Sequence, residues 1–330
     1  MKRSAEARES PAAEGSAPRR DVVAGPASAG PQKARPVKLA PEDSTEDAAI
    51  CVFLSALDQF EANARALRAQ EDPECVHQMR VALRRLRAAI GLFRNALSGP
   101  ALDAARERAK AIASVLGAAR DWDVFREMLE AGPRAAFEQE PSFFALLDAV
   151  ASRRATAYAQ ARAKLDETQA VQFVAEFRAA IELRDWNAAA DARDEGSAKG
   201  FAQAALTRLR KRVMKKSRGL ADLSPEDRHQ ARIALKKARY GAEFFQSLFP
   251  HRRGARRFSR ALAELQDGLG AFNDMETVTP LLDEIDAGDG GVTMRASAFV
   301  RGWFAHAARA GVEHARESEK RLKELAPFWS

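Results

Sequence analysis

Residues 76–97 read VHQMRVALRRLRAAIGLFRNAL, and residues 228–249 read RHQARIALKKARYGAEFFQSLF. The two stretches agree at an offset of 152 residues. A second pair follows about forty residues further on, where LGAARDWDVF (116–125) matches LGAFNDMETV (269–278) at an offset of 153. The sequence therefore indicates an internal duplication of a unit of roughly 150 residues. The identical pairs in the first block are His77 with His229, Gln78 with Gln230, Arg80 with Arg232, Ala82 with Ala234, Leu83 with Leu235, Arg87 with Arg239 and Phe93 with Phe245.

The repeated stretch has the apolar period of a helix with a cationic stripe beside it. Apolar residues recur every three or four positions from Val76 to Leu97, which predicts a buried seam. One residue along, the same spacing selects charged residues, and from His77 to Arg87 they cover about 15 Å of helix axis. We call these two sets the stripes. The first stripe is His77, Arg80, Arg84 and Arg87, and the second is His229, Arg232, Lys236 and Arg239.

Like charges at this spacing on a helix repel one another, and the repulsion grows near a packed seam. On its own helix the first stripe has only Glu74 to offset it, whereas the second runs into Glu243. A bound polyanion would supply the missing negative charge, and the planar fork of arginine suits phosphate. In the competing interpretation, the aliphatic parts of the arginine side chains pack on the core while the guanidinium groups stay in water. Alternatively, acidic side chains from other helices neutralise them.

Composition narrows the class of protein. The formal net charge of +7 and the pI near 9.6 favour a polyanionic partner. Two cysteines, Cys51 and Cys75, form no disulfide framework. The sequence contains no stretch of about 18 apolar residues, so we expect no membrane span. Residues 1–15 also lack the apolar region of a secretory signal peptide. We expect a cytoplasmic protein.

The helical period of the apolar residues and the positions of proline and glycine between the periodic segments predict an all-α protein. We expect a disordered tail over 1–44, a first helical half over 45–190 and a second over 191–330. No segment predicts a strand, and residues 184–197 are the expected linker. The expected helices are 47–70, 74–97, 101–117, 121–131, 141–166 and 169–183, then 198–218, 225–249, 254–270, 274–286 and 293–325.

The second repeated block predicts a helix–turn–helix junction, with Gly117 and Gly270 at helix ends and Asp121 and Asp274 as caps. The alternative is that the two aspartates orient a histidine or arginine of the stripes. Other basic residues flank the repeats, mainly in the runs 208–218 and 252–260. Further candidate contacts for a polyanion are Arg94, Arg120, Arg208, Arg212, Lys215, Arg253, Arg256 and Arg257.

At these motifs the chain resembles the CHAD domain, the conserved histidine α-helical domain of bacteria and archaea. VHQMRVALRRLR with LGAARDWDV, and HQARIALKKARYGAEFF with LGAFNDME, carry the resemblance over roughly 47–325. It implies two helical bundles related by a pseudo-twofold axis around a basic central cavity. It also implies binding of inorganic polyphosphate, association with polyphosphate granules, and a cavity lined by both stripes. Residues 1–46 do not resemble the CYTH triphosphatase domain that accompanies many members, so we expect a stand-alone member without that activity.

Three functions compete. The leading hypothesis is non-catalytic polyphosphate binding, which salt would weaken and which acid would strengthen if the histidines bind as cations. General polyanion or nucleic-acid binding is the first alternative, although no aromatic residue is interleaved with the first stripe. A phosphoanhydride-processing enzyme is the second, although no phosphate loop or metal-binding motif is present. We expect no cofactor, no metal and no membrane partner.

Overall fold

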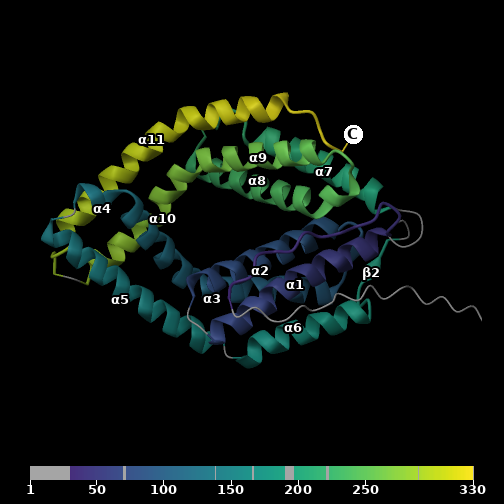
Figure 1. Cartoon of the computed structure of the whole chain (residues 1–330), viewed down its shortest axis with the longest axis horizontal. Helices are drawn as coiled ribbons and strands as arrows, with labels where there is room; N and C mark the ends of the chain where they lie inside the picture. The colour runs from purple at the N-terminus through teal and green to yellow at the C-terminus, as the bar shows by residue number, and fades with distance from the viewer. Residues whose placement is uncertain are drawn as a thin grey trace, which may run out of the picture.

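A computed structural model of the chain describes residues 30–69, 72–137, 139–165, 167–189, 197–220, 223–288 and 290–329. It confirms the all-α class (Figure 1). None of the described helices has the length and apolar character needed to cross a membrane. The helices are α1 (Thr45–Ala69), α2 (Pro73–Phe93), α3 (Pro100–Ala131), α4 (Pro133–Ala136), α5 (Pro141–Lys164), α6 (Glu167–Glu182), α7 (Ala198–Lys216), α8 (Pro225–Phe245), the 3-10 helix η3 (Gln246–Leu248), α9 (Arg252–Gly268), α10 (Gly270–Asp286) and α11 (Met294–Glu324).

The helices that carry the stripes, α2 and α8, begin in the same way. Each has proline in its first turn, where a missing N–H costs nothing. The Asp72 side chain accepts from the backbone N–H of Glu74 at 2.8 Å, and the Ser224 hydroxyl accepts from the N–H of Asp227 at 3.2 Å. Both bounds of α8 lie 152 residues after those of α2, the same offset as in the sequence.

The predicted junction in the first half is wrong. Helix α3 runs unbroken from Pro100 to Ala131, so Gly117 lies inside a helix and Asp121 caps none. In the second half the chain does break, at Leu269 between α9 and α10, but α10 begins at Gly270, so Asp274 lies inside that helix and does not cap it either. Alanine-rich sequence around Gly117 keeps the helical hydrogen bonds intact, because one glycine costs a helix only about 1 kcal/mol.

Two further expectations need correction. Short strands exist, because β1 (Leu97–Ser98) pairs antiparallel with β2 (Asn187–Ala188). The latter belongs to the expected linker, of which residues 190–196 lie outside the described residues. Of the expected disordered tail, residues 30–44 are described and packed on the helices: Val37 and Leu39 are buried, and the Leu39 N–H donates to Ser247 Oγ at 2.9 Å. Residues 1–29 lie outside the described residues.

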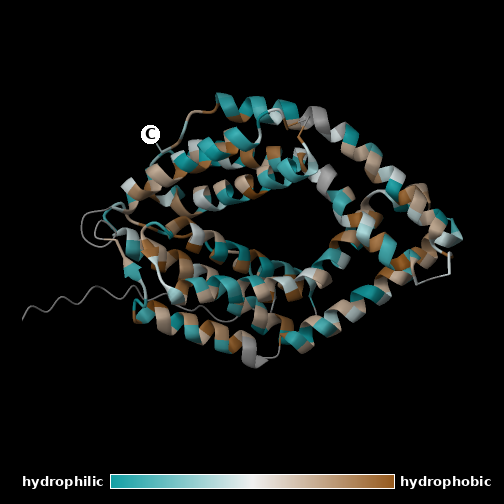
Figure 2. Ribbon diagram, turned by 180° about the vertical axis from the view of Figure 1, so that it is seen from behind, coloured by the Kyte–Doolittle hydropathy of each residue, from teal (hydrophilic) through white to brown (hydrophobic). Residues whose placement is uncertain are grey.

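The two halves contact each other through two sets of helices. Helices α2 and α8, and α1 and α7, meet in one region, while α5 and α11, and α3 and α10, meet in another (Figure 1). Hydrophilic and hydrophobic residues alternate along the helices (Figure 2), so each helix has an apolar face for the core. Between the halves, the ring of Phe93 meets that of Phe245 edge-on at 5.9 Å and stacks on Phe201 at 5.0 Å.

Candidate polyanion-binding site

The stripes lie on α2 and α8, and their residues differ in exposure. His77, Arg80, Arg84 and Arg87 of α2 are all half-buried. On α8, Arg232 and Lys236 are half-buried, whereas His229 and Arg239 are exposed. Because α2 packs on α8, with α1 and α3 on one side and α7 and α9 on the other, the inner members of both stripes share one region of the interface.

Arg80 and Arg232, which are aligned in the sequence, make the same kind of contact. Arg80 Nη1 donates to the carbonyl oxygen of Ala113 in α3 at 2.7 Å, and Arg232 Nη1 donates to that of Leu269 at 3.1 Å. Each arginine is thus held against the helix that follows it. Gly117 makes room for the first contact, because a Cβ at this position would lie 2.9 Å from Arg80 Nη1.

Three arginines of α2 keep a buried donor without a partner. The Nε atoms of Arg80, Arg84 and Arg87 are inaccessible to solvent, and no acceptor among the described residues reaches them. An unsatisfied buried donor costs about 1–3 kcal/mol, more when the group is charged. These three arginines follow one another along one face of α2, and their positive charge is incompletely balanced by the acidic side chains of the described residues.

Lys236 shows that the two stripes face each other. Burial and the cations Arg232, Arg84, Arg80 and Arg239 together lower its pKa to about 8. Two of these are on α2 and two on its own helix, so charges from both stripes act on one ammonium group. No acidic side chain of the described residues forms an ion pair with Lys236. The protonated form is therefore destabilised until negative charge arrives.

His77 and His229, the histidines of the two stripes, lie in different surroundings. Burial lowers the pKa of His77 below its ordinary value, and Arg120 and Arg84 act in the same direction against Glu74 and Glu127. His77 is therefore neutral near pH 7 before a ligand binds, and it is a hydrogen-bond donor rather than a fixed charge. Its aligned partner His229 is exposed.

The cationic region extends beyond the stripes. Burial lowers the pKa of Arg87, as does Arg106 of α3. Burial also lowers the pKa of Lys237, with contributions from Arg212, Arg106 and Arg87. Sequence reasoning did not include Arg106 or Lys237, although Lys237 follows a stripe residue directly. Side chains from α2, α3, α7 and α8 thus converge here.

The remaining candidates divide by their surroundings. Arg94 lies 3.9 Å from Asp103, and Arg120 pairs with Glu127 at 3.0 Å. Arg239 donates to Gln266 Oε1 at 3.0 Å. Of the exposed residues on α7, Arg208 and Arg212 line a pocket described below, and Lys215 does not. No contact joins the exposed α9 residues to the stripes; they are Arg253, Arg256 and Arg257.

Arg85 is the residue that sequence reasoning missed between the stripes. Its side chain is fully buried, its Nε donates to Glu243 Oε1 of α8 at 2.9 Å, and its Nη1 donates to Gln59 Oε1 at 2.9 Å. The guanidinium also lies over the ring of Phe244 at 5.5 Å. Glu243, the acid that interrupts the second stripe, therefore neutralises Arg85 instead of a stripe residue.

Asp121 and Asp274 act on the stripes electrostatically. Burial raises the pKa of Asp121, while Arg80 and Arg120 oppose the rise; burial raises that of Asp274, while Arg232 opposes it. Each aspartate in turn favours the charged form of its arginine. No hydrogen bond or ion pair joins Asp121 to a stripe residue among the described residues, so its orienting role stays a prediction.

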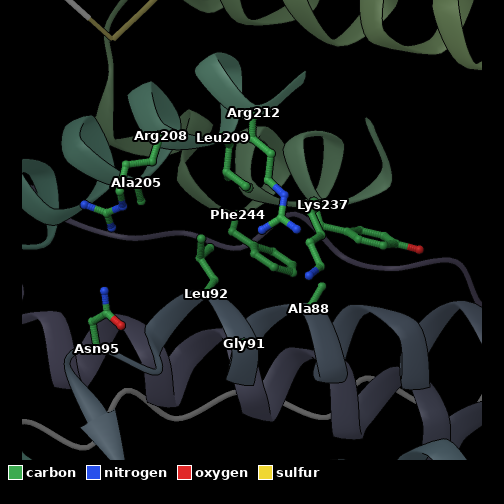
Figure 3. A pocket seen from close by; sticks show the side chains of 12 residues that line it. Ala88, Gly91, Leu92, Asn95, Ala205, Arg208, Leu209, Arg212, Lys237 and Phe244 are labelled. Carbon is green, nitrogen blue, oxygen red and sulfur yellow. The ribbon is translucent and has the colours of Figure 1, made fainter. Parts of the chain in front are cut away.

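A basic central cavity stays a prediction, and the described residues form a pocket beside the second stripe. It is a cavity of about 230 Å³ between α2, α7 and α8, next to Lys237 (Figure 3). The pocket lies toward the C-terminal end of α2, where Gly91 lines it, whereas the first stripe begins at His77 near the N-terminal end.

Comparison with known proteins identifies the fold. The chain is similar to the crystal structure of the CHAD domain from the plant Ricinus communis, with a TM-score of 0.72 and 27% identity over 88% of this chain and 96% of that one. It is also similar to PptA from Streptomyces chartreusis, with a TM-score of 0.62 and 16% identity over 84% and 100% of the respective chains, a likeness of fold alone. No curated protein matches. A family model of the CHAD domain matches residues 51–283, and the chain therefore belongs to that family.

Proposed function

We propose that this protein binds inorganic polyphosphate without transforming it, and that both stripes contact the ligand. The observation that carries the proposal is the row of half-buried arginines Arg80, Arg84 and Arg87, none of which forms an ion pair with an acidic side chain of the described residues. Arginine donors of this kind match phosphate oxygens, which can accept two bonds from one guanidinium. A chain of linked phosphates offers such oxygens repeatedly along its length.

The charge on Lys236 supports the same ligand. Its pKa of about 8 results from burial and from four neighbouring arginines, so a polyanion between the stripes would stabilise the ammonium form. A ligand that reaches both stripes gains from α2 and α8 together. A single phosphate would reach only part of this array, which favours a linear polymer.

Nucleic acid is the second candidate, since it also presents a row of phosphates. Single-strand binding proteins add aromatic side chains on which bases stack. The stripes and their cationic neighbours contain none, so the site offers charge without a stacking surface. We therefore expect polyphosphate to be preferred at equal phosphate concentration.

The proposal includes association with polyphosphate granules in the cytoplasm, which rests on the family resemblance. A fluorescent fusion observed in cells rich in polyphosphate tests it. The fusion should follow the granules, and a uniform signal would contradict this part of the proposal.

A competition titration tests the binding itself. Labelled long-chain polyphosphate is held on the protein and challenged with single-stranded DNA at matched phosphate concentration and near-physiological salt. The double variant Arg84→Gln with Lys236→Gln removes two charges from facing stripes. The matched control, Arg256→Gln with Arg257→Gln, removes two exposed charges from α9.

We expect the stripe variant to lose at least tenfold in affinity, since each charge-assisted bond contributes about 1.5–3 kcal/mol. The α9 variant should change by less than about threefold, and DNA should displace polyphosphate poorly. Equal losses in both variants would make the basic surface a general polyanion patch. Release of inorganic phosphate from polyphosphate in the presence of Mg²⁺ would overturn the non-catalytic part.

A further inference from the structure

The cavity between α2, α7 and α8 combines cationic and apolar walls. Arg208, Arg212 and Lys237 supply its positive charge, and no acidic residue lines it. Much of the remaining lining is apolar, including Leu92 and Phe244. Figure 3 shows Arg212 and Lys237 converging beside Phe244, with Arg208 at the other end of the cavity near Asn95.

The charges of this pocket have no protein counterion. Among the described residues, no acidic side chain forms an ion pair with Arg208, Arg212 or Lys237. Burial, together with Arg212, Arg106 and Arg87, lowers the pKa of Lys237 below its ordinary value. The pocket therefore favours an anion on electrostatic grounds alone.

The duplicated sequence shows which negative group is missing. At the offset of 152, Lys237 aligns with Arg85, and Gly91 aligns with Glu243. One of these pairings is complete, because Arg85 donates to Glu243 at 2.9 Å and lies over Phe244. In the other pairing, Lys237 and Gly91 line the same cavity, and no carboxylate lines it to pair with Lys237.

We propose that this pocket binds a small organic phosphate, whose phosphate group takes the place that a carboxylate fills in the Arg85–Glu243 pair. Three cations suit a doubly charged phosphate monoester better than a single carboxylate. The organic part lies against Leu92 and Leu209, because ligand pockets join a few polar contacts to a mainly apolar lining.

This inference goes beyond polyphosphate binding, because the apolar lining offers nothing to an inorganic phosphate chain. An inorganic ligand would leave the half-buried side chains of Leu92 and Leu209 in contact with water. A phosphate ester of an apolar alcohol would cover them, which adds binding free energy in proportion to the apolar area buried.

Calorimetric titration of the full chain with phenyl phosphate and with inorganic phosphate, at one fixed salt concentration, tests the proposal. We expect phenyl phosphate to bind at least about tenfold more tightly, since burial of a ring contributes well over 1.4 kcal/mol. Equal affinity of the two probes, or no binding of phenyl phosphate, would overturn the proposal without any variant.

Gly91→Glu supplies the missing carboxylate. A Cβ at Gly91 meets nothing within 4 Å, so the longer side chain enters without a backbone clash and can reach Lys237. The matched control is Gly302→Glu, which adds the same charge at an exposed position of α11 where a Cβ also meets nothing within 4 Å. Lys237→Met serves as a second variant at an exposed position.

Gly91→Glu and Lys237→Met should each weaken phenyl phosphate binding at least about tenfold, as expected for loss of a charge-assisted contact, whereas Gly302→Glu should change it less than about twofold. Polyphosphate affinity is measured on the same samples. Selective loss of phenyl phosphate supports a separate pocket, and parallel loss of both ligands refutes it. Failure of the wild-type protein to bind polyphosphate would count against the proposed function alone.

Discussion

Replacement of Lys236 by methionine should stabilise the free protein at pH 7. Methionine keeps most of the apolar stem and removes the charge that four arginines oppose. The interval between the ordinary lysine pKa of 10.5 and about 8 corresponds to about 3 kcal/mol. We therefore expect the free energy of unfolding to rise by about 1–3 kcal/mol, measured by urea denaturation.

The difference in the free energy of unfolding between Lys236→Met and the wild type should depend on pH, and it should decrease as the pH rises above 8. Below pH 8 Lys236 is charged in both the folded and the unfolded protein, so the full cost applies to the wild type. Between pH 8 and 10.5 the folded protein binds fewer protons than the unfolded one, and wild-type stability rises relative to the variant. Above pH 10.5 Lys236 is neutral in both the folded and the unfolded state, so its charge no longer contributes to the difference in stability between the wild type and the variant.

The control for this experiment is Lys215→Met, at an exposed position of α7 outside the stripes. It should change the free energy of unfolding by less than about 0.5 kcal/mol. A loss of stability in Lys236→Met at pH 7, or a difference that does not vary between pH 8 and 10.5, would refute the electrostatic reasoning.

Three further outcomes are expected. Arg85→Met should lower the free energy of unfolding by about 3 kcal/mol, because it leaves the Glu243 carboxylate without its partner, and adding Glu243→Met should recover part of the loss in the same urea assay. Gly117→Ala should weaken polyphosphate binding about threefold or more, because the new Cβ displaces Arg80, whereas Gly302→Ala should not; titration of both variants against wild type decides. The logarithm of polyphosphate affinity should fall linearly with the logarithm of salt concentration, and the Arg84→Gln, Lys236→Gln variant should give a slope shallower by about 1–2, whereas an equal slope would exclude both residues from direct contact.

The sequence predicted those parts of the fold that local pattern determines. The helices expected to begin at residues 74 and 225 begin within one residue of these positions, and the period of three to four residues identified their buried and charged faces. The break expected at Gly117 failed because glycine is only mildly unfavourable in a helix, and the same motif ends a helix in the second half.

The site was predicted less completely because charge balance is set between helices. The stripe arginines could be read from spacing, yet nothing local showed that Glu243 pairs with Arg85 of α2. Nor could the sequence show that Arg94 and Arg120 have acidic neighbours. The pKa of His77 depends on burial and on Arg120 from α3, so its neutral form could not be anticipated from one helix.

The contact between Phe93 and Phe245 joins two aligned residues, which is how a symmetric dimer uses one surface patch twice. A half-length chain carrying the first copy alone would present Phe93 to solvent and could pair with itself through that ring. Fusing both copies in one polypeptide holds them at a high effective concentration. Each copy can then diverge without disrupting assembly. Gly91 in one copy aligns with Glu243 in the other, and the two identical chains of a homodimer could not have this difference.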